Sequence, residues 1–282
     1  MNSRIRGPAP EWASDQSAAP LGGDQLLPLL YRIEARSGWS VGMRKITHAL
    51  LAGQTVPQGF IVDIGCGGGG LLAELAARQP ARALCGVDLY AQALNHARAN
   101  VVSSVSFAQA NLHALPFCDD SVALLLVLDA VDQRAVHLPQ ALHEFRRVLC
   151  RDGLMLIRVS AFDWLTGPHD KAFNTGHRYD TAELMYWVRK AGFTLERVTF
   201  ANTLLSLPEG ALRLFQRWRV LPFFPSLYTT RAVDILLRVA LLGEARWLQS
   251  HDLPGGMSLY ALARKICDDH LSHSSGIQGH NQ

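Results

Sequence analysis

The sequence predicts an α/β protein with a Rossmann-like, seven-stranded, mostly parallel sheet that carries helices on both faces. Two observations predict this fold class. Short apolar runs alternate with helical segments between about residues 60 and 160, which is typical of parallel strands joined by helical crossovers. The first run leads directly into the glycine-rich turn "GCGGGG", residues 65–70, where another molecule can approach the main chain closely. N-terminal helices and a helical cap inserted before the last strand complete the predicted architecture.

The segments before the first strand differ sharply in composition. Residues 1–24 are rich in Pro, Ser, Ala and Gly, and we predict a disordered arm there. Residues 25–52 carry apolar side chains at helical spacing, with a break near Ser37 and Gly38. This pattern predicts two helices ahead of the sheet.

The spacing of apolar residues, which changes between strand-like and helical, predicts the strands and helices of the core. Strands are expected at residues 59–65, 83–88, 104–110, 121–131 and 154–160, and helices at 70–79, 90–100 and 138–153. Gly153 is expected to end the last of these helices. A helix over 180–192, begun by Asp180 or Thr181 and stopped by Gly192, then precedes a strand at 193–200.

The C-terminal part returns to the sheet after a long excursion. Residues 202–255 are helical in pattern but interrupted by prolines, and "GMSLYALARK" (256–265) reads as the last strand. We therefore expect the core that carries the sheet at 53–201 and 256–267, a cap at 202–255 and a disordered tail at 268–282.

Composition narrows the function classes. The net charge of +3 comes with scattered arginines, so no nucleic-acid partner is expected. No apolar run reaches the ~18 residues that a transmembrane helix needs. The five cysteines show neither CxxC pairs nor paired spacing with histidine, so we expect neither a disulfide framework nor a metal site. The N-terminus lacks the apolar stretch of a secretory signal, and we expect a cytoplasmic protein.

The glycine turn alone fits a dinucleotide as well as other ligands. Asp63, two residues before the first glycine, would repel a pyrophosphate but would attract an ammonium group. Asp88 closes the second strand, where a carboxylate can accept hydrogen bonds from both ribose hydroxyls, although a loop cap is an equal alternative. After the third strand, the Asn111 amide and the Leu112 N–H could meet adenine, although an asparagine turn explains Asn111 as well.

Four separated motifs resemble those of class I S-adenosylmethionine-dependent methyltransferases of the bacterial small-molecule, type 11-like kind. They are "VDIGCGGGG", "GVDLYAQAL", "NLHALPFCDDSVALLLVLDAV" and "ALHEFRRVLCRDGLMLIRV". The resemblance runs from about Leu50 to Val159. It extends more loosely to both flanks, where Glu34, Trp39 and Arg44 resemble a helix that precedes the core in one bacterial branch.

The resemblance implies S-adenosyl-L-methionine as cofactor and assigns its contacts. Asp63 and the turn Gly65, Cys66 and Gly67 would hold the methionine part. The ribose would lie against Asp88 and Leu89, and adenine against Asn111 and Leu112. Asp129, after the fourth strand, is expected to contact the cofactor or form a wall of the transfer site. The family usually has Asp at position 111 and Glu-His at positions 132 and 133, so no histidine role transfers to Gln133.

A general base is needed only if the acceptor arrives protonated. The loop after the fifth strand supplies four candidates: His169, Asp170, His177 and Tyr179. A histidine beside an acid suits proton removal near neutral pH. Stabilisation of the loop through hydrogen bonds is the alternative role of these residues, and the sequence leaves both roles open.

The sequence therefore predicts a methyltransferase acting on a small or medium-sized acceptor, in bacterial specialised metabolism by resemblance. The aromatic and arginine-rich segment 202–250 favours a hydrophobic lid over a soluble aromatic or peptide substrate. An apolar or lipid-linked acceptor that enters from a membrane surface, with peripheral membrane contact, is the alternative. A nucleotide-dependent oxidoreductase is a weaker alternative, because an apolar residue at position 63 would suit it better. The third hypothesis is a protein that keeps the fold and binds the cofactor but catalyses no reaction.

Overall fold

The computed structural model describes residues 37–102, 104–167, 170, 174–204, 206, 210 and 231–265. The expected N-terminal arm, the first predicted helix and the C-terminal tail lie outside the described residues. The helices are α2 (Gly38–Leu51), α3 (Gly70–Arg78), α4 (Ala91–Asn100), α5 (Leu138–Val148), the 3-10 helix η2 (Asp163–Leu165), α7 (Thr181–Lys190) and α9 (Arg231–Trp247). The strands are β1 (Phe60–Ile64), β2 (Leu84–Asp88), β3 (Val105–Gln109), β4 (Val122–Leu128), β5 (Leu149–Ser160), β6 (Phe193–Ala201) and β7 (Ser258–Lys265).

One seven-stranded sheet organises the molecule, with the strand order β3-β2-β1-β4-β5-β7-β6. Strands β1 to β5 pair in parallel, whereas β7 is antiparallel to both β5 and β6. The order reverses between β1 and β4, and ligands of open α/β sheets bind at the carboxyl ends of the strands beside such a reversal. The predicted fold class is confirmed.

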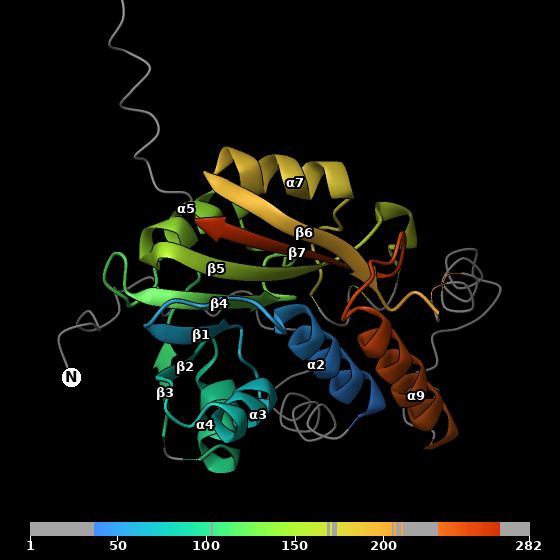
Figure 1. Cartoon of the computed structure of the whole chain (residues 1–282), viewed down its shortest axis with the longest axis horizontal. Helices are drawn as coiled ribbons and strands as arrows, with labels where there is room; N and C mark the ends of the chain where they lie inside the picture. Colours follow the sequence, from blue (N-terminus) through green and yellow to red (C-terminus); the bar gives the residue numbers. More distant parts are fainter. Residues whose placement is uncertain are drawn as a thin grey trace, which may run out of the picture.

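Side chains of successive strand residues pack into two hydrophobic cores, one on each face of the sheet. Val62 and Ile64 of β1 belong to the core formed with α5 and α7, while Ile61 belongs to the core formed with α2, α3 and α9. Figure 1 shows the two layers, with α5 and α7 on one side and α2, α3, α4 and α9 on the other. This arrangement buries both faces, which explains why the strands are nearly continuous apolar runs.

The boundary between α5 and β5 differs from the prediction. Helix α5 ends at Val148, and β5 already begins at Leu149, so Gly153 does not stop the helix. Leu149 pairs with Val122 of β4, and the register then shifts before Leu154 pairs with Leu124. Sheet pairing of Leu149 thus overrides the helical spacing of the segment.

Within the described part of the segment between β6 and β7, residues 231–247 form the long helix α9, which packs along α2 (Figure 1). Gly42 of α2 allows this close approach, because a Cβ there would lie 2.4 Å from the Cβ of Leu241. The Gly38 N–H also donates a hydrogen bond to Asp234 Oδ1 at 2.5 Å. Within the described residues, no helix is both long enough and apolar enough to span a bilayer.

Candidate active site

The turn between β1 and α3 depends on glycine at three positions. Gly65, Gly67 and Gly69 have φ values of 72°, 50° and 76°, in the left-handed region that other residues rarely adopt. The Gly65 N–H donates to Val87 O at 2.8 Å, which ties the turn to β2. A Cβ at Gly69 would lie 2.8 Å from a methyl group of Val101. Packing and the hydrogen bond to β2 therefore fix the turn, and Gly65, Gly68 and Gly70 line the cleft next to it.

Asp88 lies at the carboxyl end of β2, next to this turn. Its Oδ2 accepts from the Gly67 N–H at 3.0 Å, and its Oδ1 accepts from the Tyr90 N–H at 2.9 Å. Burial raises the pKa of the Asp88 carboxyl, while these backbone hydrogen bonds act in the opposite direction. The carboxylate is thus held in a fixed orientation at the sheet edge.

Leu89, expected to contact the ribose, follows β2, whereas Asn111 and Leu112, expected to contact adenine, follow β3. Asn111 Oδ1 accepts from the His113 N–H at 3.0 Å, as in an asparagine turn. Leu112 packs partly buried against the core on the α5 side. The Leu89 carbonyl accepts from Gln109 Nε2 at 2.9 Å. Because Asn111 Oδ1 has a second lone pair, the turn contact leaves an acceptor position that a ligand could use.

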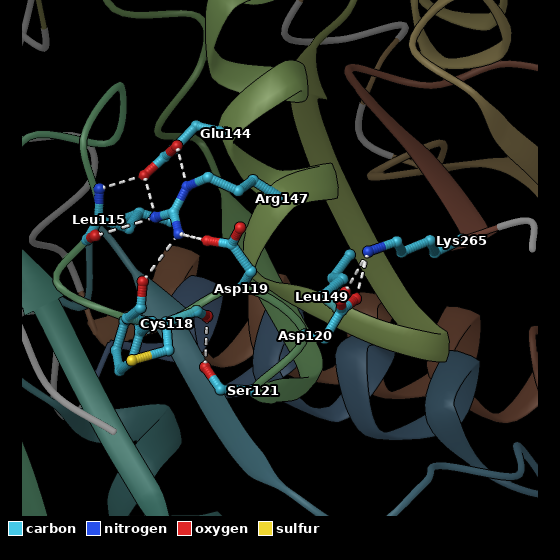
Figure 2. Close-up of polar contacts among 10 residues, drawn as sticks. Leu115, Cys118, Asp119, Asp120, Ser121, Glu144, Arg147, Leu149 and Lys265 are labelled. Carbon is cyan, nitrogen blue, oxygen red and sulfur yellow. Dashed lines mark hydrogen bonds and ion pairs between the residues drawn. The ribbon is translucent and has the colours of Figure 1, made fainter. Parts of the chain in front are cut away.

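An arginine from α5 stabilises the chain that follows Asn111 (Figure 2). The Arg147 guanidinium donates to Leu115 O, to Phe117 O at 2.9 Å and to both carboxylate oxygens of Glu144. Glu144 Oε1 in turn accepts from the Leu115 N–H at 2.6 Å. This pair fixes residues 115–117 against α5, directly after the predicted adenine contact.

A cleft of about 630 Å³, counting the part open to solvent, lies between α2 and the glycine turn. Its lining combines apolar and charged side chains: Trp39, Ser40, Met43, Arg44, Thr47, Asp63, Gly65, Cys66, Gly68, Gly70, Leu71, Leu128 and Arg158. Asp63, buried at 4% exposure, and the guanidinium groups of Arg44 and Arg158 therefore line the same space. A ligand end that carries both an ammonium and a carboxylate matches this charge distribution.

Arg44 is held beside the turn by a carboxylate of α3. Its Nε donates to Glu74 Oε1 at 2.8 Å, and Glu74 Oε2 lies 2.9 Å from His48 Nε2. Burial would raise the pKa of Glu74, but the hydrogen bonds from His48 and Arg44 outweigh it and hold the pKa well below its usual range. An ionised Glu74 therefore holds the Arg44 guanidinium close to the glycine turn. A Cβ added at Gly70 would lie 3.3 Å from Arg44 Nη1.

Asp129 forms an ion pair with Arg158, which lines the cleft. The Asp129 carboxylate receives two hydrogen bonds from the guanidinium, at 2.7 Å from Nε and 2.5 Å from Nη2. Arg158 also donates to the Tyr260 hydroxyl at 3.1 Å and lies over the Trp39 ring at 5.5 Å. The contact of Asp129 with the cofactor or the transfer site stays a prediction. Arg158, which lines the cleft, was not predicted, because alternation within a strand predicts only a buried position there.

Asp132, in the loop after β4, is buried at 1% exposure. Its Oδ2 accepts from the Ser160 N–H at 3.1 Å, and its carbonyl accepts from the Gly176 N–H at 2.7 Å. Burial, followed by the nearby Asp129, raises the pKa of Asp132 to about 6. The residue thus connects the loops that follow β4 and β5.

Of the four predicted base candidates, His169 lies outside the described residues. Asp170 is buried in an ion pair with Arg178, with Oδ1 at 3.0 Å from Nε and 2.5 Å from Nη2. Its Oδ2 accepts from the Gly167 N–H at 2.7 Å, and Arg178 also donates to Ala161 O. These contacts are those of a residue that stabilises the loop, which is one of the two roles the sequence left open.

His177 and Tyr179 lie in contact with each other. Their rings meet edge to face with centroids 4.4 Å apart. His177 Nε2 lies 3.0 Å from both carboxylate oxygens of Glu183, and its side chain is 44% exposed. Tyr179 is buried, its hydroxyl donates to Val131 O at 3.4 Å, and burial raises its pKa above the ordinary value. The arrangement leaves His177, with Glu183 as its partner, as the accessible base candidate among the described three.

One of two sequence comparisons with known proteins found a match. Residues 61–153 match the family model described as a methyltransferase domain. A comparison of the sequence with curated proteins found no match.

Several solved structures share the fold. An S-adenosylmethionine-dependent methyltransferase from Mesorhizobium loti is similar at 20% identity and a TM-score of 0.51, covering 78% of this chain and 98% of that chain. The [4+2]-cyclase SpnF is similar at 17% identity and a TM-score of 0.54, covering 82% and 84%. Phosphoethanolamine N-methyltransferase 2 from Haemonchus contortus, solved with S-adenosylhomocysteine, has 15% identity and a TM-score of 0.52, covering 81% and 53%. At these identities the likeness concerns the fold.

Proposed function

We propose that this chain, whose residues 61–153 match a methyltransferase domain, transfers a methyl group from S-adenosylmethionine to a small or medium-sized acceptor. The observation that carries the proposal is the cleft beside the bare glycine turn, in which Asp63 and Arg44 both line the wall. The methionine end of the cofactor carries one ammonium and one carboxylate, so each charge would meet its opposite.

The remaining contacts follow along the same sheet edge. Asp88 would accept hydrogen bonds from the ribose hydroxyls, beside Leu89, while its other lone pairs keep the Gly67 and Tyr90 N–H groups. Asn111 and Leu112 would border adenine, on a segment that Arg147 and Glu144 hold in place. We assign the backbone of Gly65, Cys66 and Gly67 to the methionine part, because a bare turn permits close approach there.

When bound, the cofactor supplies an electrophilic methyl group on a sulfonium. The chain then has to align the acceptor with that methyl and keep water out, and alignment of this kind can supply ~7–11 kcal/mol of the barrier. Asp129, paired with Arg158, would form one wall of the acceptor site. For an acceptor that arrives protonated, His177 would take the proton at Nδ1, because its Nε2–H donates to the Glu183 carboxylate, and that carboxylate would stabilise the resulting imidazolium.

A second function class has a specific observation in its favour. The fold neighbour SpnF is named as a [4+2]-cyclase, so this architecture is compatible with chemistry other than methyl transfer. Cofactor binding without a methylated product would favour this class, or a binding protein, over the proposed methyltransferase.

Cofactor binding is tested first, by calorimetry with S-adenosylhomocysteine and with NAD. Asp88→Ala is expected to raise the dissociation constant of the thioether at least about tenfold, equivalent to ~1.4 kcal/mol. Asp163→Ala, a change of an exposed aspartate outside the cleft, is the matched control and should leave it unchanged. Tighter binding of NAD, or an unaffected Asp88→Ala variant, would contradict the assignment of the cleft.

Methyl transfer is tested with methyl-deuterated S-adenosylmethionine in cell extracts, with mass spectrometry of the labelled products. Loss of labelling in His177→Ala with unchanged thioether affinity would support a base role for His177. Equal labelling by wild type and variant at every pH would assign His177 and Tyr179 to the loop structure alone.

A further inference from the structure

The outward half of α9 is both apolar and basic. Five large apolar side chains on this helix are between 38% and 62% exposed: Ile235, Leu236, Val239, Leu242 and Trp247. Arg231, Arg238 and Arg246 are exposed as well. At 3.6 residues per turn these eight positions fall on one half of the helix. Arg231 and Arg238 lie along one border of the apolar positions, and Arg246 lies among them. We call this set the outer face of α9.

The acidic residues of α9 lie on its inward half. Asp234 accepts from the Gly38 N–H of α2. Glu244, buried at 3% exposure, accepts from the Thr203 and Leu204 N–H groups at 2.8 Å each. The outer face therefore carries three positive charges and no negative one within α9.

We propose that the outer face of α9 binds an anionic membrane surface. A helix with arginines at the border of an aliphatic and tryptophan face, and one arginine within it, fits the boundary between headgroups and acyl chains. The arginine stems can cover apolar surface while their guanidinium groups reach lipid phosphates. Charge complementarity thus favours an anionic bilayer over a neutral apolar partner.

The position of α9 gives this surface a possible use. Its inward side packs closely on α2, where Gly42 faces Leu241, and α2 lines the cleft with Trp39, Met43 and Arg44. Packed helix axes are about 8–10 Å apart, so a membrane bound to α9 would lie one helix away from the cleft. An acceptor held in or on that membrane would need to travel only a short distance.

Vesicle sedimentation of the full chain tests the proposal without any cofactor, so its failure is separate from failure of the methyltransferase proposal. Binding is expected to vesicles of phosphatidylcholine with phosphatidylglycerol, to weaken at high salt, and to be much weaker with phosphatidylcholine alone. Arg238→Glu should lower the partition coefficient at least about fivefold, since one basic residue near an anionic surface contributes about that factor. Val239→Glu should lower it about tenfold or more.

Matched controls come from exposed residues far from α9. Val102, 61% exposed, is as accessible as Val239, which is 62% exposed, and Val102→Glu should bind vesicles like wild type. Arg78→Glu changes the net charge as Arg238→Glu does and should also bind normally. Equal losses in the control variants would overturn the proposal, because they would indicate a response to net charge alone.

Two further outcomes would also overturn it. A large fall in the thermal midpoint of Val239→Glu without vesicles would show that this face is covered by the chain itself. A concentration-dependent dimer that Val239→Glu abolishes would assign the face to a second copy. An unchanged midpoint and a monomer, together with variant-sensitive vesicle binding, would support the membrane assignment.

Discussion

Replacing Asp132 by asparagine should change how the stability of the fold depends on pH. The Asp132 carboxyl is buried at 1% exposure, and its pKa is raised from 3.8 to about 6 by burial and by the neighbouring Asp129. A shift of about two units corresponds to ~3 kcal/mol between the protonated and ionised forms. Because the folded-state pKa is raised, the stabilisation from the protonated form is complete below about pH 4 and is lost as the pH rises through about 6.

Asp132→Asn removes this titration while keeping an acceptor for the Ser160 N–H. We therefore expect the stability of the variant relative to wild type to rise by ~3 kcal/mol between pH 4 and pH 7 and then to level off. At roughly 2–4 °C per kcal/mol, the difference in thermal midpoint should change by about 6–12 °C. Thermal unfolding of both proteins at intervals of one pH unit measures this difference. A pH-independent effect of the substitution on the midpoint would not alter how the difference changes with pH.

Asp163→Asn, a substitution of an exposed aspartate in η2, serves as the control and should show no such trend against wild type. A flat difference between Asp132→Asn and wild type from pH 4 to pH 8 would refute the reasoning. It would mean that hydrogen bonds from Ser160 and Gln133 offset the burial completely and that Asp132 ionises in its ordinary range.

Two further predictions concern packing and the adenine segment. Gly42→Ala is expected to destabilise the fold by ~1–3 kcal/mol in denaturant unfolding, because its Cβ would meet Leu241 at 2.4 Å; Gly243→Ala, on α9 with nothing within 4 Å of the added Cβ, should instead stabilise it by ~0.5–1 kcal/mol. Arg147→Lys should weaken S-adenosylhomocysteine binding about tenfold by calorimetry, since lysine cannot hold Leu115 O, Phe117 O and Glu144 together. Lys265→Met, which removes contacts to Asp120 and Leu149 O, should leave that affinity unchanged.

The strands and the glycine turn could be predicted because their signals are local. Apolar runs bounded by glycine or polar residues fixed β1, β2 and β4 to within a few residues, and Asp180 with Gly192 marked both ends of α7. The end of α5 could not be predicted in this way. Its helical spacing continues past Val148, and only the pairing of Leu149 with Val122 on another strand ends it.

The candidate site shows the same contrast between residues that local patterns predict and contacts that join distant segments. Asp63 and Asp88 follow directly from strand ends, and parallel pairing places those ends at one edge. The partner of each charged group could not be read from the sequence, because these pairs join separate elements. Arg44 with Glu74, and Arg158 with Asp129, are separated by 30 and 29 positions. A buried strand arginine has no local pattern that distinguishes it from a core residue.

These pairs explain how a cleft can carry two guanidinium groups and still accept a zwitterion. Each arginine is already compensated by a carboxylate, Glu74 for Arg44 and Asp129 for Arg158, so the groups are oriented before a ligand arrives. An oriented guanidinium has little left to reorganise when a carboxylate binds, whereas a flexible one would lose rotamer entropy. The ligand that best suits such a cleft adds one positive and one negative charge together, because an unbalanced anion or cation would leave Asp63 or Arg44 facing a like charge. The charge pattern thus favours the amino-acid end of S-adenosylmethionine over a pyrophosphate, independently of the glycine motif.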